Sequence, residues 1–212
     1  MYGPGSRGLF SPKLDFMSVS ILGVGIGSFL FHASLRQSLQ FVDDLSMIVL
    51  GASMLHGVFT VRQSASQRTI TSVILGIGVV GFSGFYVWSG KIIYHLAAFT
   101  SQMLLILARC LYLFHRATPR FPEDKVWEWR KGHWAAIATF LLGYLLWNID
   151  LELCAELRDL RRQVGVPWAF GLELHGWWHV LTALGADMFM QTVRDIHAFE
   201  ARSEGSKGKK DI

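Results

Sequence analysis

The stretch Ser28–Met47 reads SFLFHASLRQSLQFVDDLSM, and a short polar bend within it joins two apolar runs. Ser28 and His32 are four residues apart in the first run, so they would lie on one face of a helix. Asp43 and Asp44 open the second run. Polar and ionisable side chains are costly inside a membrane span, so this cluster indicates a functional site.

The composition is that of a membrane protein. Of the 212 residues, 51% are hydrophobic and 17% are charged, whereas about 25% are charged in a typical soluble domain. The formal net charge is +4, but the basic residues occur in short clusters between apolar runs, which argues against a nucleic-acid partner. Cys110 and Cys154 are too few for a disulfide scaffold.

Six stretches approach the roughly 20 apolar residues that a membrane-spanning helix needs. They predict helices near Leu14–Leu35, Gln40–Val61, Thr69–Trp88, Ile92–Phe114, Trp134–Leu151 and His175–Phe199. The predicted fold class is therefore all-α, a polytopic membrane helix bundle with six transmembrane helices. Gly23 and Gly27 are spaced at i, i+4 on the first helix, which predicts close approach of a neighbouring helix.

Composition also divides the chain into segments. Residues 1–13 form an N-terminal polar segment, residues 14–199 a transmembrane domain, and residues 200–212 a polar tail that we expect to be disordered and cytosolic. Lysine and arginine concentrate in alternate connections, and short loops rich in them remain cytosolic. Both termini of this chain are therefore predicted to be cytosolic.

His175 and His179 form the most specific local pattern, HGWWH. Two imidazoles at i, i+4 face the same way and suit two ligands of one metal ion. The alternative is an interfacial pair flanked by membrane-belt tryptophans. The predicted topology favours a metal site over an interfacial pair. It puts His32 and Asp43 at the same membrane face as the two histidines of the HGWWH motif, opposite the C-terminal tail. Three histidines with an open position are a frequent arrangement for catalytic zinc.

A carboxylate and a hydroxyl near such a metal would have natural roles. Zinc bound by neutral imidazoles lowers the pKa of a water from about 16 toward about 7. Asp43 is the predicted base, which would accept the proton of this water and return it to a leaving amine. Ser28 could donate a hydrogen bond to a developing oxyanion; alternatively, its hydroxyl bonds back to the carbonyl of residue 24.

Four blocks of the sequence carry a family resemblance. They are GSFLFHASL at 27–35, an aspartate eleven residues after the first histidine of the cluster, WNID at 147–150 and HGWWH at 175–179. On these blocks the chain resembles the alkaline ceramidases, which belong to a wider group of seven-helix zinc-dependent membrane hydrolases that includes the adiponectin receptors. The resemblance makes residues 14–199 a transmembrane hydrolase domain.

The resemblance also implies a ligand set and a reaction. Zinc would be held by His32, His175 and His179, and Ser28 and Asp43 would complete the site of an amidohydrolase. The substrate would be ceramide, including phytoceramide or dihydroceramide, cleaved to a sphingoid base and a free fatty acid. The protein would be integral to the endoplasmic reticulum or Golgi membrane, with the site at the lumenal face.

The chain departs from the family in two places. Asp44 and Ser46 stand where the family has glutamate and proline in D-E-L-P-M. The family also has one more transmembrane helix before the equivalent of Leu14–Leu35, preceded by an acidic segment that binds calcium. Residues 1–10 contain no carboxylate, so the calcium site of the family cannot be assigned here. Cys154 corresponds to a cysteine that pairs with that segment and is expected to be unpaired.

Two other functions stay open, and so do several residue roles. An esterase that remodels the lipid of glycosylphosphatidylinositol anchors would use the same site, and a receptor-like regulatory protein would hold structural zinc. Asn148 and Asp150 either orient a metal-binding histidine or cap a helix end. Arg109 and Asp187 are intramembrane charges that could pair. The oligomeric state is not indicated by the sequence.

Overall fold

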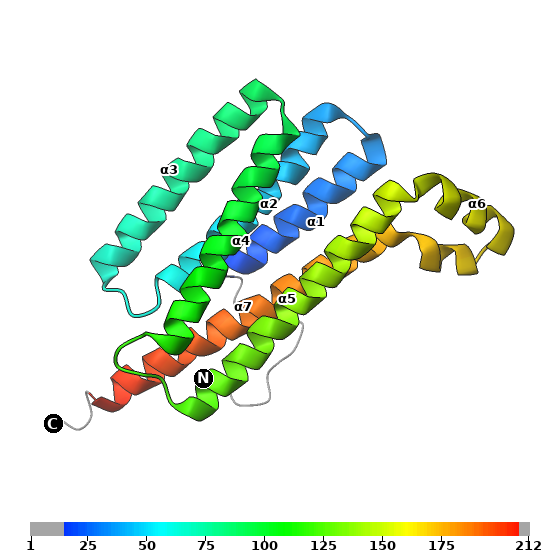
Figure 1. The fold of residues 1–212 in the computed structure, drawn as a ribbon. Helices are drawn as coiled ribbons and strands as arrows, with labels where there is room; N and C mark the ends of the chain where they lie inside the picture. Colours follow the sequence, from blue (N-terminus) through cyan, green and yellow to red (C-terminus); the bar gives the residue numbers. More distant parts are fainter. Residues whose placement is uncertain (1–14, 208–212) are drawn as a thin grey trace. The chain divides into compact units, whose positions relative to one another are not determined.

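A computed structural model describes residues 15–207, and every regular element in this part of the chain is a helix. The predicted all-α class is therefore confirmed. The helices are α1 (Phe16–Ser34), α2 (Gln37–Phe59), α3 (Ala65–Ser89), α4 (Ile92–His115), α5 (Glu123–Glu152), α6 (Cys154–Val164), the 3₁₀ helix η1 (Trp168–Leu172) and α7 (Leu174–Lys207). Figure 1 shows their course. The predicted N-terminal polar segment, residues 1–13, lies outside the described residues.

Five of these helices, α1 to α5, are long and apolar enough to cross a membrane. The sixth predicted span, α7, has 34 residues, or about 51 Å at 1.5 Å per residue, which exceeds the roughly 30 Å of a bilayer core. It is not among the five because polar side chains such as Asp187 and Arg194 lower its hydropathy. This helix has the length of a span but not the usual composition of one.

The first compact unit, Met1–Arg116, is built around α2. This helix packs against α1, α3 and α4, and its inner face carries core side chains such as Leu55 and Val58. A Cβ on Gly51 would lie 2.8 Å from Cδ of Gln102, so the Gln102 side chain of α4 fills the space that the missing side chain of Gly51 leaves. Nε2 of Gln102 donates a hydrogen bond to the Ile48 carbonyl at 3.0 Å. The contact thus combines close packing with a polar tie.

The contact between α1 and α2 depends on Gly27. A Cβ there would lie 3.3 Å from the Val42 carbonyl oxygen and 3.4 Å from Cα of Asp43. The predicted close approach is therefore confirmed at Gly27. It is wrong at Gly23, where a Cβ would meet nothing within 4 Å. The close contact at Gly27 lies directly beside Ser28 in the sequence.

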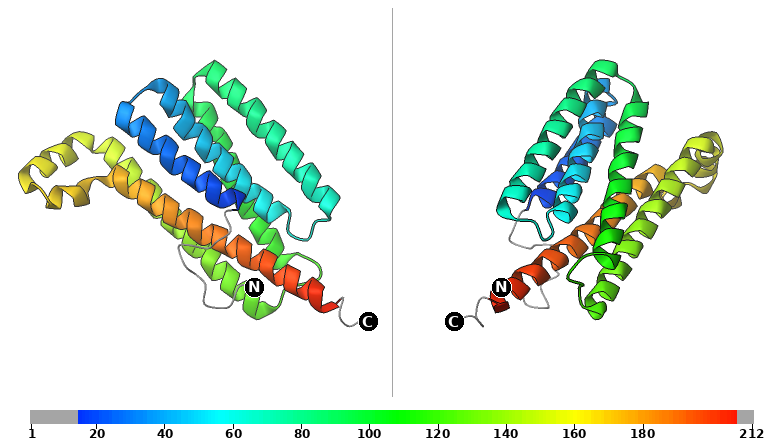
Figure 2. Two further views of the ribbon diagram at one scale, coloured as in Figure 1. Left: turned by 180° about the vertical axis from the view of Figure 1, so that it is seen from behind. Right: turned by 60° about the vertical axis from the view of Figure 1, so that its left-hand side comes forward.

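The second compact unit, Ala117–Ile212, contains two long helices, α5 and α7. They run side by side in Figure 1 and in both views of Figure 2. Glycines on both helices allow this contact: a Cβ on Gly143 would lie 3.1 Å from Cβ of Leu181, and one on Gly185 would lie 3.0 Å from the Ala136 carbonyl oxygen. The connection between the two helices folds into α6 and η1.

The end of α7 corrects the prediction for the tail. The helix continues to Lys207, so residues 200–207 are helical where disorder was expected; residues 208–212 lie outside the described part. Alanine, glutamate and arginine follow Phe199, and all three have high helix propensity. Nε of Arg202 also donates a hydrogen bond to the carbonyl of Ala198 at 3.1 Å. The loss of apolar residues after Phe199 marks the end of an apolar segment and not the end of the helix.

Candidate functional site

Ser28, His32 and Asp43 come together within the first unit. The Ser28 hydroxyl on α1 donates a hydrogen bond to the Asp43 carboxylate on α2, and His32 is close enough to interact electrostatically with that carboxylate. Ser28 is buried, with 8% of its surface exposed. The close helix contact at Gly27 brings the two backbones near enough for the hydroxyl to reach the carboxylate. The predicted serine, histidine and aspartate of the first two helices are therefore neighbours.

Asp44 faces a different set of residues, which the sequence did not predict. Oδ2 of Asp44 accepts a hydrogen bond of 2.6 Å from the Tyr86 hydroxyl on α3, and its Oδ1 lies 4.0 Å from Nε2 of His95 on α4. Tyr86 and His95 are 1% and 4% exposed. Successive residues of a helix point about 100° apart, so the two acids serve different neighbours: Asp43 faces α1, and Asp44 ties α2 to α3 and α4.

We expect Tyr86→Phe to destabilise the protein by about 1–3 kcal/mol, because a partly buried carboxylate would lose its charge-assisted hydrogen bond. The measurement is thermal unfolding of the detergent-purified protein. Tyr94→Phe is the matched control, since the hydroxyl of Tyr94 makes no hydrogen bond among the described residues. Equal stability of wild type and Tyr86→Phe would show that the Asp44 contact contributes nothing to the fold.

His175 and His179 lie in the first two turns of α7, as predicted. Their Nε2 atoms are 3.0 Å apart, and the ring centroids are 4.7 Å apart. Between them in sequence, Trp178 packs against Phe140 and Trp147 of α5. Packing on α5 therefore holds this side of α7 in place, and the two imidazoles point their ring nitrogens toward each other.

The two imidazoles could bind a metal ion. A tetrahedral zinc ion, with bonds of about 2.0–2.1 Å to histidine nitrogen, separates two of its ligand atoms by about 3.3 Å. The observed separation of 3.0 Å is close to this value. Neutral imidazole nitrogens are also ligands that zinc prefers. The residues present therefore fit zinc in both chemistry and spacing.

Arg109 and Asp187, which the sequence predicted as intramembrane charges, each contact residues of their own unit. Arg109 donates hydrogen bonds to the Val58 and Phe59 carbonyls at 3.3 and 3.5 Å, and its guanidinium lies 5.4 Å from the centre of the Phe59 ring. It thus satisfies carbonyl groups at the C-terminal end of α2, where a cation is favourable. Asp187 accepts a hydrogen bond of 2.6 Å from Gln191 on its own helix.

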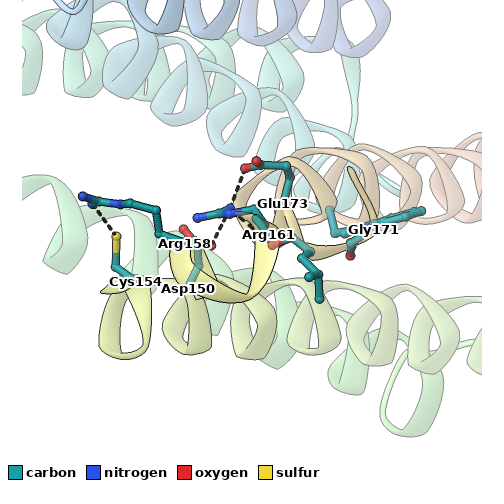
Figure 3. A network of polar contacts seen from close by, with 8 residues as sticks. Asp150, Cys154, Arg158, Arg161, Gly171 and Glu173 are labelled. Atoms are coloured by element: carbon teal, nitrogen blue, oxygen red, sulfur yellow. Dashed lines mark hydrogen bonds and ion pairs between the residues drawn. The ribbon is translucent and has the colours of Figure 1, made fainter. Parts of the chain in front are cut away.

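Asn148 and Asp150 differ in what they contact. Nδ2 of Asn148 donates a hydrogen bond to the Tyr144 carbonyl one turn earlier at 2.7 Å, which is a contact within its own helix. Asp150 faces Arg161 of α6, with 4.0 Å between Oδ1 and Nη1, as Figure 3 shows. The sequence could not predict this contact, because α6 itself was not predicted.

Comparison with known proteins identifies the family of this chain. The family model described as Ceramidase matches residues 7–210. The chain is 28% identical over 167 residues to "Alkaline ceramidase 3" of Mus musculus, which covers 77% of this chain and 58% of the relative. It is 27% identical over 188 residues to "Alkaline ceramidase YPC1" of Saccharomyces cerevisiae, which covers 82% and 58%. The chain thus spans a little over half the length of these relatives. Since the family match extends over most of the sequence, the chain belongs to the ceramidase family.

Proposed function

We propose that this protein is a zinc-dependent membrane amidohydrolase that cleaves the amide bond of ceramide to a sphingoid base and a free fatty acid. The observation that carries the proposal is the Ser28–Asp43 hydrogen bond beside His32, in a chain whose α7 holds a second pair of convergent imidazoles. Two relatives named alkaline ceramidases support the choice of substrate.

His32, His175 and His179 would hold the zinc ion. When bound, zinc would supply a Lewis acid for the amide carbonyl and a water whose pKa is lowered from about 16 toward about 7. Neutral imidazoles leave the net charge of the metal intact, which is typical of catalytic zinc sites with three protein ligands. In this proposal His32 comes from α1, and the other two ligands come from α7.

Asp43 would act as general base and then as general acid. Its carboxylate accepts the proton of the attacking water and later returns it to the leaving amine of the sphingoid base. Because Asp43 lies beside Ser28, its protonation state would decide which group receives the hydrogen bond of the Ser28 hydroxyl. While Asp43 is ionised, it accepts the hydrogen of the Ser28 hydroxyl. Once protonated, Asp43 becomes a donor, so the Ser28 hydroxyl can instead donate to the oxyanion of the tetrahedral intermediate.

The same proposal includes a location and an orientation. The protein would be integral to the endoplasmic reticulum or Golgi membrane, with both termini of this chain in the cytosol and the site at the lumenal face. Lysine and arginine are concentrated in alternate connections. Short loops rich in these residues remain cytosolic, which supports this orientation.

The test is hydrolysis by the detergent-purified protein of ceramide and of a matched lipid in which an ester replaces the amide, with zinc content measured on the same sample. We expect about one zinc ion per chain and release of fatty acid from ceramide. Zinc binding without hydrolysis of any sphingolipid would reject the enzyme and favour a receptor-like protein with structural zinc. Hydrolysis of the ester alone would favour the anchor-remodelling esterase.

A further inference from the structure

Arg161 of α6 lies where the end of α5 and the start of α7 meet. Its Nη1 donates a hydrogen bond of 2.7 Å to Oε2 of Glu173 and one of 3.3 Å to the Leu172 carbonyl. The same nitrogen lies 4.0 Å from Oδ1 of Asp150 near the end of α5. Figure 3 shows the guanidinium between the two carboxylates. The Arg161 side chain therefore contacts both the end of α5 and the residues just before α7.

Glu173 is 55% exposed, but the burial of Arg161 and Asp150 distinguishes their contact from an ordinary surface ion pair. The side chains of Arg161 and Asp150 are only 17% and 20% exposed. Oδ1 of Asp150 is buried and accepts no hydrogen bond from the described residues, so Arg161 is the cation that compensates its charge. A carboxylate that is largely removed from water is unfavourable without such a partner. Loss of Arg161 would therefore disturb this junction.

Glu173 connects this contact to the proposed metal ligands. It directly precedes α7, and its carbonyl accepts the hydrogen bond of the Trp177 backbone amide at 3.3 Å. His175 is in the first turn of α7, two residues after Glu173. His179 is one turn further on, beside the aromatic packing of Trp178 on α5. The placement of His175 thus depends more than that of His179 on what holds the start of the helix.

We infer that Arg161 is a positioning residue for His175. It holds Glu173, and through it the first turn of α7, so that the two imidazoles keep the 3.0 Å separation of their Nε2 atoms. That the ion bound by these histidines is zinc rests on the proposed function. The geometric part, in which Arg161 orders the first turn of α7, does not rest on it.

The experiment compares Arg161→Gln with Arg162→Gln in the detergent-purified full chain. Arg162 is the matched control, because it lies on the same helix, its side chain is 73% exposed and, among residues 15–207, it pairs only with Asp159 of that helix at 3.5 Å. The first readout is hydrogen–deuterium exchange of the zinc-free protein. We expect Arg161→Gln, and not Arg162→Gln, to speed exchange of the amides of residues 174–179, with no change at residues 185–195.

The second readout is the affinity for Zn²⁺ by competition with a chelator. We expect Arg161→Gln to weaken it about 10–100-fold, as for other groups that orient metal ligands, and Arg161→Lys to restore part of it. Adding Glu173→Gln to Arg161→Gln should weaken zinc binding little further, because both substitutions remove the same contact between Arg161 and Glu173. Unchanged exchange at residues 174–179 would overturn the inference whether or not zinc binds. Faster exchange with unchanged zinc affinity would also overturn it. A wild-type protein that binds no zinc would instead reject the proposed function.

Discussion

Asp43→Asn is expected to lower kcat for ceramide hydrolysis about 10³-fold, within the range of about 10²–10⁴ that general acid–base catalysis contributes. The amide has nearly the shape of the carboxylate, and its oxygen can still accept the Ser28 hydrogen bond. It cannot accept the proton of the attacking water. We therefore expect the variant to fold, to retain zinc and to lose turnover. Fatty-acid release and zinc content, measured on one sample, check all three expectations.

Asp44→Asn is the comparison that assigns the base to one of two adjacent acids. An asparagine at this position can still accept the hydrogen bond of the Tyr86 hydroxyl. We therefore expect the activity to fall less than about tenfold, corresponding to the roughly 1.4 kcal/mol of one hydrogen bond. Equal losses in the two variants would remove the distinction between the acids. Full activity of Asp43→Asn would reject Asp43 as the base.

His179→Ala is expected to weaken zinc binding about 10²–10³-fold and to abolish hydrolysis. Structural zinc sites with four ligands have apparent binding free energies of about 10–16 kcal/mol, or about 2.5–4 kcal/mol per ligand. Loss of one of three ligands should therefore leave the protein largely free of zinc after dialysis against a chelator. The measurement is zinc per chain before and after dialysis.

Two further variants make this experiment specific. His197→Ala changes a histidine of the same helix that has no proposed role in the site, and we expect it to keep zinc. His32→Ala removes the ligand contributed by the first unit, and we expect it to lose zinc as His179→Ala does. Zinc retention in His32→Ala, together with its loss in His179→Ala, would show that the second unit binds the metal without the first.

The predicted helices agree closely with the structure wherever hydropathy decides them. The predicted spans Ile92–Phe114 and Thr69–Trp88 correspond to α4 (Ile92–His115) and α3 (Ala65–Ser89). In lipid every backbone polar group needs an internal partner, so a long apolar run forms a helix whatever surrounds it. Hydropathy does not predict α6, a polar helix, or the helical end of α7, because neither needs an apolar sequence.

The spacing of residues along one helix was equally informative. Two imidazoles at i, i+4 must share a helix face, and the 3.0 Å between His175 and His179 follows from that periodicity and from suitable rotamers. The neighbouring pair Ser28 and Asp43 required more, since the two residues are on different helices. The glycine at position 27, predicted as a point of close approach, made that contact possible.

The sequence alone thus predicted the all-α class, the long apolar helices and the shared helix face of His175 and His179, because these depend on local composition and helical periodicity. Only the tertiary structure decided which neighbour each acid serves. Asp43 meets Ser28 and Asp44 meets Tyr86 because α2 packs in one rotation against α1 and α3. Likewise, Arg161 contacts Glu173 only because α6 folds back toward the start of α7. Helix rotation and chain reversal arise from packing between distant segments, and no periodicity within a single segment encodes them.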